Sequence, residues 1–449
     1  VSSGDTLDVD GSIDANGTIK LDGSYPTGTN NTALGNTTLD TINGSAIANT
    51  AIGYAAGTAL TDGDENTLLG NLAGGALTTQ SGNVAIGSLA MQSAAADTTV
   101  AIGKEALKLS TGSNNVAIGH LVAIANTSGN GLTIIGSAAG QAHTTGIRNT
   151  LVGGFAGGDL DVGSDNTVLG YDALRTSVTA SNNTAIGKSA LQYANSGSEN
   201  TAVGLEALQA ATSGTRNPAH NAAIGFQSGK SITTGDYNVF AGSRAGYGVT
   251  EGNYNSVMGY DAGYSLAGAD RNTLIGHAAG YSLSSGNNNV FLGANSGNDA
   301  TSGEQNTGLG TDTLANIIGG GYNIAAGYQA GYSFTSGHST VAIGYRSSYS
   351  SSTSIRHVAM GYQSNYGGNS SDLVAIGYRA AYAASTTSSS QANSTFIGHS
   401  SGEAGNVTTG PRNNVTYVGN ESGKQAAHTT GNFSQNVGIG DSALQANSA

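Results

Sequence analysis

The residues from Asn272 to Asn288 read NTLIGHAAGYSLSSGNN, and the next stretch, from Asn289, reads NVFLGANSGNDATSGEQ. The chain then begins the same pattern again at Asn306 with NTGLGTDTLANIIGGGY. Each copy has a short apolar run, a glycine, a second short segment and a polar stretch. A repeat of fixed length indicates a structural unit that stacks on its neighbours.

The glycine after each apolar run, such as Gly276, marks the repeat, and we call it the anchor glycine. There are 24 anchors between Gly35 and Gly440, and 15 of the 23 spacings are 17 residues long, whereas four are 21. With 71 glycines in 449 residues, the composition alone would suggest disorder or low complexity. The fixed period overrides that interpretation.

The residues before the anchor predict a strand. The residue three before it is Thr, Val or Ile in 22 units, and the residue directly before it is apolar in all 24. We therefore predict that each coil contains a strand, a glycine bend, a second short strand and a polar loop. The fold class is all-β: a β-roll-like β-solenoid of stacked coils of about 17 residues. Asn stands four before the anchor in 17 units and is expected to form a hydrogen-bonded ladder.

The pattern divides the chain into two segments. Residues 1–28 alternate differently and predict a short N-terminal β segment. Residues 29–449 predict a solenoid of 24 repeats, with longer inserted loops in 376–449. Asp8, Asp10 and Asp14 suggest calcium, but their spacing does not match an EF-hand loop, so we favour solvated strand edges.

The residue two before the anchor predicts self-association. Neighbouring strand residues face opposite ways, so we expect this residue to point outward if those on either side of it fill the coil. It is apolar in 22 of 24 units, and an outward apolar stripe implies a partner. A parallel homotrimer satisfies this. The predicted contact residues are Ala185, Ala202, Phe240, Phe291, Ala342, Ala359 and Ala375.

The unit N-[TV]-A-I-G-Y-x-A-[GL]-Y-S-x-T-[ST]-G-x-N, over roughly residues 30–449, is similar to the repeats of phage tail fibres and virion spikes. It resembles more loosely the head repeats of YadA-like trimeric autotransporter adhesins. The resemblance implies a homotrimeric, extracellular structural and adhesive fibre, most simply a tail-fibre shaft for host attachment. Its partners would be a host-surface glycan or protein and other tail or baseplate proteins. The alternative is a bacterial trimeric surface adhesin or extracellular filament subunit.

Tyrosines in successive repeats mark a candidate binding surface. They lie directly after the anchor or five residues after it, and the longer loops add polar residues. The candidate receptor- or glycan-binding residues are Tyr345, Tyr349, Tyr362, Tyr366, Tyr378, Tyr382, Pro411 and Arg412. The alternatives are that the rings only stabilise the stack and that the loops vary in length without function.

Other functions find little support in the sequence. The net charge of −13 argues against nucleic acid, and the lack of a long apolar run argues against membrane insertion. No catalytic motif appears, so we expect neither an enzyme nor a cofactor. His120, His277 and His399 lie in distant repeats, which argues against a metal site. A glycan-cleaving spike remains a minor alternative, because the later repeats place no carboxylates at equivalent positions in adjacent coils.

Overall fold

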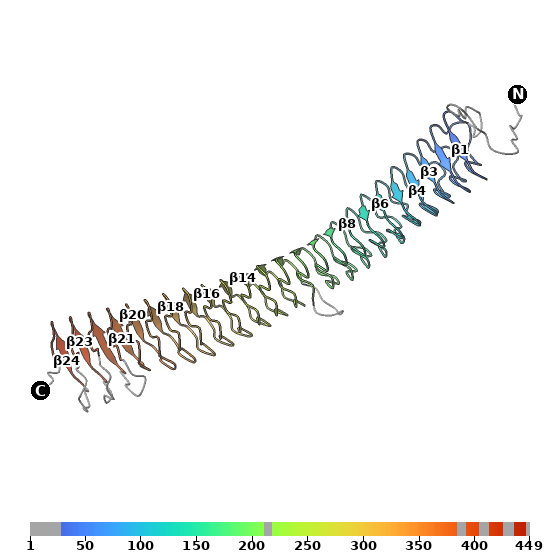
Figure 1. Ribbon diagram of the computed structural model, residues 1–449. Coiled ribbons are helices and arrows are strands. Elements are labelled where there is room, and N and C mark those ends of the chain that lie inside the picture. The colour runs from blue at the N-terminus through green and yellow to red at the C-terminus, as the bar shows by residue number, and fades with distance from the viewer. Residues whose placement is uncertain (1–27, 211–217, 384–391, 404–412, 425–434, 446–449) are drawn as a thin grey trace, which may run out of the picture. The chain divides into compact units, whose positions relative to one another are not determined.

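The computed structural model describes residues 28–210, 218–383, 392–403, 413–424 and 435–445. Within these ranges the chain has 24 short strands and no helix (Figure 1). One strand precedes each predicted anchor glycine, so the β-solenoid of about 17-residue coils is confirmed. The chain divides into two units, Val1–Gly131 and Leu132–Ala449. The predicted N-terminal segment, residues 1–28, lies almost wholly outside the described residues.

The strands are three or four residues long. In the first unit they are β1 (Thr32–Leu34), β2 (Thr50–Ile52), β3 (Thr67–Leu69), β4 (Val84–Ile86), β5 (Val100–Ile102) and β6 (Val116–Ile118). In the second unit they are β7 (Thr133–Ile135), β8 (Thr150–Val152), β9 (Thr167–Leu169), β10 (Thr184–Ile186), β11 (Thr201–Val203), β12 (Ala222–Ile224), β13 (Val239–Ala241), β14 (Ser256–Met258), β15 (Thr273–Ile275), β16 (Val290–Leu292), β17 (Thr307–Leu309), β18 (Ile324–Ala326), β19 (Val341–Ile343), β20 (Val358–Met360), β21 (Leu373–Ile376), β22 (Ser394–Ile397), β23 (Thr416–Val418) and β24 (Val437–Ile439).

Within each unit every strand pairs in parallel with the strand of the next coil. Leu274 of β15 lies opposite Phe291 of β16, which in turn lies opposite Gly308 of β17. The same register joins Ala85 to Ala101 in the first unit. Equivalent residues of successive coils therefore form columns along each stack, about 4.8 Å apart.

The predicted orientation of the strand residues is wrong. The middle residue of each strand points into the coil, and its neighbours point outward: Ala342 is 0% exposed, whereas Ile343 is 36% exposed. The coil interior must also hold an asparagine and a small residue after the anchor, so it has room for only one side chain from a three-residue strand. All seven predicted trimer contacts are buried in their own chain: Ala185, Ala202, Phe240, Phe291, Ala342, Ala359 and Ala375.

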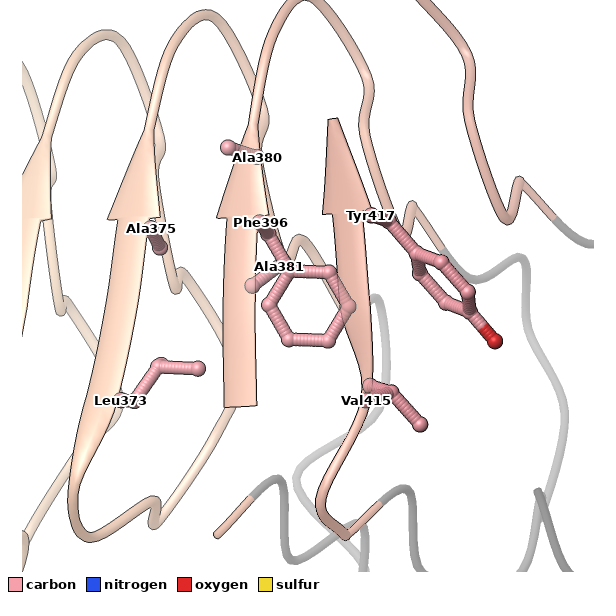
Figure 2. Close-up of a cluster of buried hydrophobic side chains, with 7 residues drawn as sticks. All are labelled: Leu373, Ala375, Ala380, Ala381, Phe396, Val415 and Tyr417. Carbon is pink, nitrogen blue, oxygen red and sulfur yellow. The ribbon is translucent and has the colours of Figure 1, made fainter. Parts of the chain in front are cut away.

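The core repeats with the coil. In the coil of β15, Leu274, Ala279 and Leu283 are fully buried beside Asn272. Towards the C-terminus the composition changes, and Leu373 and Val415 occupy the position that Asn holds in most coils. Figure 2 shows both of these residues in one cluster of buried apolar side chains with Phe396, Tyr417 and three alanines.

The anchor glycine is required for two reasons. Gly276 has φ of 135°, a conformation that is almost restricted to glycine. A Cβ on Gly276 would also lie 2.5 Å from the carbonyl oxygen of Gly293, in the next coil. Positive φ and close approach of the backbones therefore act together.

The segment after the anchor is not the predicted second strand but a series of turns. Positive φ recurs there at alternate residues, as in Gln329 (55°) and Gly331 (61°), and this is incompatible with a strand. The turns still stack, because backbone groups bond between coils: the Gly331 N–H donates to the Ser347 carbonyl at 2.9 Å.

The asparagine ladder is present as predicted. The backbone N–H and the side-chain amide of Asn272 donate to Asn255 Oδ1 at 2.9 and 3.2 Å, and Asn272 Nδ2 also donates to the Gly286 carbonyl at 3.0 Å. Asn272 is only 1% exposed, so its amide bonds to the stack and is inaccessible as a glycosylation acceptor.

Candidate functional site

The outward face of β18–β22 is apolar and aromatic. Three columns form this face: the residues three before, one before and one after each anchor. The column before the anchors includes Ile343, Met360 and Ile376, which are 36–38% exposed. None of the described side chains of the three columns in these coils is Asp, Glu, Lys or Arg, and the five coils contribute Ile324, Ala326, Tyr328, Val341, Ile343, Tyr345, Val358, Met360, Tyr362, Val374, Ile376, Tyr378, Thr395, Ile397 and His399.

The tyrosines directly after the anchors form the first aromatic stack, which we call ladder A. It consists of Tyr328, Tyr345, Tyr362, Tyr378 and His399. Ring centroids of successive members are 4.9–5.5 Å apart, and their planes differ by 7–22°. The in-register stacking of the coils sets this spacing, which is near the distance between parallel strands.

The tyrosines five residues after the anchors form a second stack, ladder B. It consists of Tyr332, Tyr349, Tyr366 and Tyr382, with centroids 5.1–5.3 Å apart. The guanidinium of Arg346 lies 5.3 Å from the ring centroid of Tyr345 and 5.2 Å from that of Tyr349, so it connects the two ladders. Burial raises the pKa of Tyr349, although the nearby Arg346 opposes this shift.

The stacking changes how these tyrosines can bind a ligand. Each inner ring has both faces against neighbouring rings, so only ring edges and hydroxyls are presented outward. From the sequence we expected that a sugar ring could stack on the face of a tyrosine such as Tyr362. Tyr345 and Tyr378 cover the two faces of that ring, so a sugar ring cannot stack there. The structure does bring the six predicted tyrosines together, and their role in binding stays a prediction. Pro411 and Arg412 lie outside the described residues.

The ladders are interrupted in the coils of β16 and β17. The residues five after the anchors are Tyr247, Tyr264 and Tyr281 in the coils of β13–β15, and their rings stack at 4.9 and 5.0 Å. The next two positions hold Asn298 and Ala315, after which ladder B begins. A hollow of about 240 Å³ lies at this gap. It is lined by Asn295, Asn298, Asp299, Asp312, Ala315, Asn316 and Tyr332.

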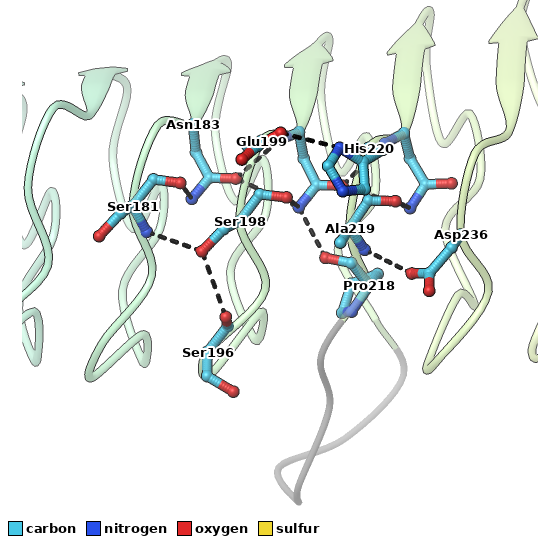
Figure 3. A network of polar contacts seen from close by, with 11 residues as sticks. Ser181, Asn183, Ser196, Ser198, Glu199, Pro218, Ala219, His220 and Asp236 are labelled. Atoms are coloured by element: carbon cyan, nitrogen blue, oxygen red, sulfur yellow. Dashed lines mark hydrogen bonds and ion pairs between the residues drawn. The ribbon is translucent and has the colours of Figure 1, made fainter.

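A third column of stacked rings, at another position of the repeat, was missed in the sequence. His220, Tyr237 and Tyr254 lie five residues before their anchors, with centroids 4.6 and 5.1 Å apart. The Glu199 carboxylate lies 2.9 Å from His220 Nδ1, and Figure 3 shows this contact within a polar network that crosses several coils. Counting residues before the anchor as well as after it would have identified this column.

Two histidines are buried. His143 Nε2 lies 3.0 Å from the amide nitrogen of Asn149, and His357 Nε2 lies 2.8 Å from the hydroxyl of Ser348. Burial lowers the pKa of His143 and of His357 to about 4, so both rings are neutral at pH 7. The sequence-predicted histidines His277 and His399 instead stack on Tyr260 and Tyr378.

The described part of the chain contains no cluster of three or more His, Cys, Asp or Glu that could hold a metal ion. It also contains no helix with the length and hydropathy to span a membrane. No known family model matches the sequence, and no curated protein shows significant similarity to it.

Proposed function

We propose that this chain is the structural and adhesive shaft of a trimeric fibre, most simply a phage tail fibre that takes part in host attachment. One observation supports this most strongly: each unit stacks its coils in register and leaves an apolar strand face outward. A stack of coils has free strand edges only at its ends, which suits an extended, protease-resistant element. Repeated coils also set a defined length between an attachment point and a receptor-binding end.

The outward face is large enough for a stable interface. The second unit has 18 strands, β7–β24, which span ~86 Å at about 4.8 Å per strand. The three columns cover four residue steps, or ~13 Å, so the face measures on the order of 1,100 Å². Outside β18–β22 the column after the anchors is mixed and includes Lys188 and Asp441, so there the apolar part of the face is the strand residues. A stable interface buries about 800 Å² on each partner.

The partner that fits this face best is another copy of the chain. Its rows repeat about every 4.8 Å, and a parallel copy has the same repeat, so side chains can interdigitate row by row over the whole unit. Isoleucine, valine and threonine at the strand positions give the β-branched surface that packs well in sheet interfaces. Three such faces around one axis would cover one another, which is the basis for proposing a trimer.

The test places a charge on outward residues of the strands. Ile343→Lys and Ile376→Lys place charges in the proposed interface, where we expect a folded chain that no longer associates. Sedimentation of the parent should give three times the chain mass of 44.3 kDa. A parent protein that sediments as a folded monomer would exclude the trimer.

The alternative is a bacterial trimeric surface adhesin or extracellular filament subunit, for which the same architecture would serve. Antibodies against the purified chain distinguish the two. Gold labelling of tails on virus particles is the result expected from a tail fibre. Labelling of the surface of bacteria that carry no virus would support the alternative instead.

A further inference from the structure

Arg346 connects the two ladders and has no counter-ion among the described residues. Its half-buried side chain is held in place, because Nε donates to Gln329 Oε1 at 2.8 Å and the rings of Tyr345 and Tyr349 lie 5.3 and 5.2 Å from the guanidinium. None of the ion pairs among the described residues includes Arg346. Its two terminal nitrogens therefore remain as donors for a group from outside the chain.

Arg244 occupies the same position of the repeat, two residues after the anchor, in the earlier aromatic run. Its guanidinium lies 5.0 Å from the ring centroid of Tyr260 and 5.5 Å from that of Tyr264, so it makes a similar bridge. Arg244 Nη2 also lies 2.5 Å from the carboxylate of Asp261, whereas the coils on either side of Arg346 carry glutamine at this position. An internal carboxylate neutralises the bridge in one run, and none does so in the other.

The coils around Arg346 also differ in charge from the rest of the chain. Residues 313–402 contain three arginines and one aspartate, although the whole chain has a net charge of −13. Arg356 is paired with this aspartate at 2.7 Å, and Arg379 is paired with Glu403 at 2.9 Å. An uncompensated arginine in a stretch of net positive charge attracts anions, which the rest of the chain repels.

Ladder B, beside Arg346, presents hydrogen-bond donors instead of ring faces. Its inner rings cover one another, so their hydroxyls and their edges face outward, and the edge is the positive part of an aromatic ring. The hydroxyls of Tyr349 and Tyr366 make no hydrogen bond to another described residue. Burial raises the pKa of Tyr349, so its hydroxyl is protonated at neutral pH and can donate. Both features favour an anion.

We propose that Arg346 and the hydroxyls of ladder B bind the carboxylates of an acidic polysaccharide. The two terminal nitrogens of Arg346 would donate in parallel to the two oxygens of a uronate or sialate group, which is the bidentate geometry that guanidinium and carboxylate share. Neighbouring sugar hydroxyls would pair with the phenols of Tyr349 and Tyr366. This inference deepens the proposed attachment function by naming a receptor class, and its biological purpose rests on that function.

Other anionic partners fit this surface less well. Single-stranded nucleic acid stacks its bases on exposed aromatic faces, and here those faces are covered. A protein partner needs an apolar centre to its interface, but the partly exposed residues that follow ladder B include Ser333, Ser350 and Ser352. Hydroxyl groups in this position suit a hydrated sugar chain better.

The binding test uses the purified full-length chain with polygalacturonate and polysialic acid, which carry uronate and sialate carboxylates. Isothermal titration calorimetry at physiological ionic strength gives the affinities. Methyl-esterified polygalacturonate keeps the sugar backbone without the charge and is the ligand control. We expect at least one acidic polymer to bind and the ester not to bind. Absence of binding by both acidic polymers, or equal binding of the ester, would overturn the proposal.

Three variants that each make the net charge more negative by one unit locate the site. Arg346→Gln introduces the residue type of both neighbouring coils, so it should fold and bind at least about tenfold more weakly. Gln329→Glu places a carboxylate at the atom that already accepts from Arg346 Nε and should have a similar effect. Arg244→Gln is the matched control, because Asp261 already neutralises this arginine, and it should leave binding unchanged.

The outcomes separate the alternatives. Equal losses in Arg346→Gln and Arg244→Gln would indicate a general charge effect and would overturn the proposal, as would full binding by folded Arg346→Gln. Tighter binding of poly-L-glutamate than of both polysaccharides would indicate a protein carboxylate and would also overturn it. Failure of the proposed fibre would appear separately, as a monomer in sedimentation. The titration would stay interpretable, because Arg346 and ladder B lie outside the three columns of the proposed interface.

Discussion

The coils of β7–β11 and those of β18–β22 share one backbone plan but are held together by different side chains. In the first region a buried amide ladder runs through Asn149, Asn166, Asn183 and Asn200. In the second region the ladder ends at Asn323, and the same position holds Thr340 and then His357. The long aromatic ladders begin in the coil where the amides end.

The difference shows two ways to stabilise the same stack. A buried amide column satisfies backbone and side-chain groups in the coil interior, whereas an aromatic column stacks rings outside it. The first leaves the outer surface free to vary, and the residues directly after the anchors there are mixed, including Gly154, Tyr171 and Lys188. The second fixes the outer surface as well, which suits a region that contacts partners.

A charge in the coil interior should break both regions equally. Ala185→Asp and Ala342→Asp each place a carboxylate at a fully buried position in the middle of a strand. An unpaired buried charge should cost about 5 kcal/mol or more, with local unfolding of the stack. Limited proteolysis followed by mass spectrometry would locate the cleavage near the substituted coil. Intact, protease-resistant variants would contradict the inward orientation.

Removal of one amide should break the first region specifically. Asn183 Nδ2 donates to the Gly197 carbonyl at 3.0 Å, and Asn183 Oδ1 accepts from the backbone of Asn200 at 2.9 Å. Asn183→Leu leaves both groups buried without their partners, which should cost about 4 kcal/mol of unfolding free energy. Urea denaturation measures this. Lys188→Ala, on the outer surface of the same coil, is the control and should change stability by less than about 0.5 kcal/mol.

Acid should weaken both regions through their buried histidines. The pKa of His357 is about 4 in the folded chain, below its ordinary value of 6.5, so the unfolded chain binds the proton more readily. The contribution of neutral His357 to stability is therefore complete above pH 6.5 and is lost as the pH falls from 6.5 to 4. The loss is about 3 kcal/mol, and His143 adds a similar term in the first region.

His357→Asn tests this, because Asn is the residue that most coils place at the same position. The variant should lose the part of the pH dependence that His357 contributes. Urea denaturation at several pH values between 4 and 7 would show it. Parallel stability curves for variant and parent across this range would contradict the assignment.

Much of this fold follows from the sequence alone. The period gives the coil length, β-branched residues give the strand, and the recurrent Asn gives the buried ladder. Which strand residues point into the coil could not be predicted reliably. A strand of three residues has a single residue on one face and two on the other, and both faces are apolar. Ala342 is inward because the coil is narrow, a property of three-dimensional volume rather than of hydropathy.

The candidate site is less visible in the sequence. The tyrosine columns are apparent from counting, but ring orientation depends on how closely the coils stack. That the faces of the inner rings are covered by their neighbours requires the structure. Asn298 and Ala315 are recognisable as an interruption in the pattern, yet the hollow there depends on residues from three coils.

Removal of one aromatic rung should have the smallest effect and should distinguish the two regions. Tyr366 stacks on Tyr349 and Tyr382, at 5.1 and 5.3 Å. Each aromatic pair contributes about 1 kcal/mol, so Tyr366→Ala should lower the free energy of unfolding by about 2 kcal/mol. At the equivalent position in the first region, Gln209 Nε2 donates to Gln192 Oε1 at 2.8 Å. This partly exposed hydrogen bond contributes about 0.5 kcal/mol, so Gln209→Ala should cost less. If urea denaturation gives equal losses of unfolding free energy for Tyr366→Ala and Gln209→Ala, the tyrosines do not replace the amides in holding the coils together. The tyrosines would then serve a ligand or partner that they contact.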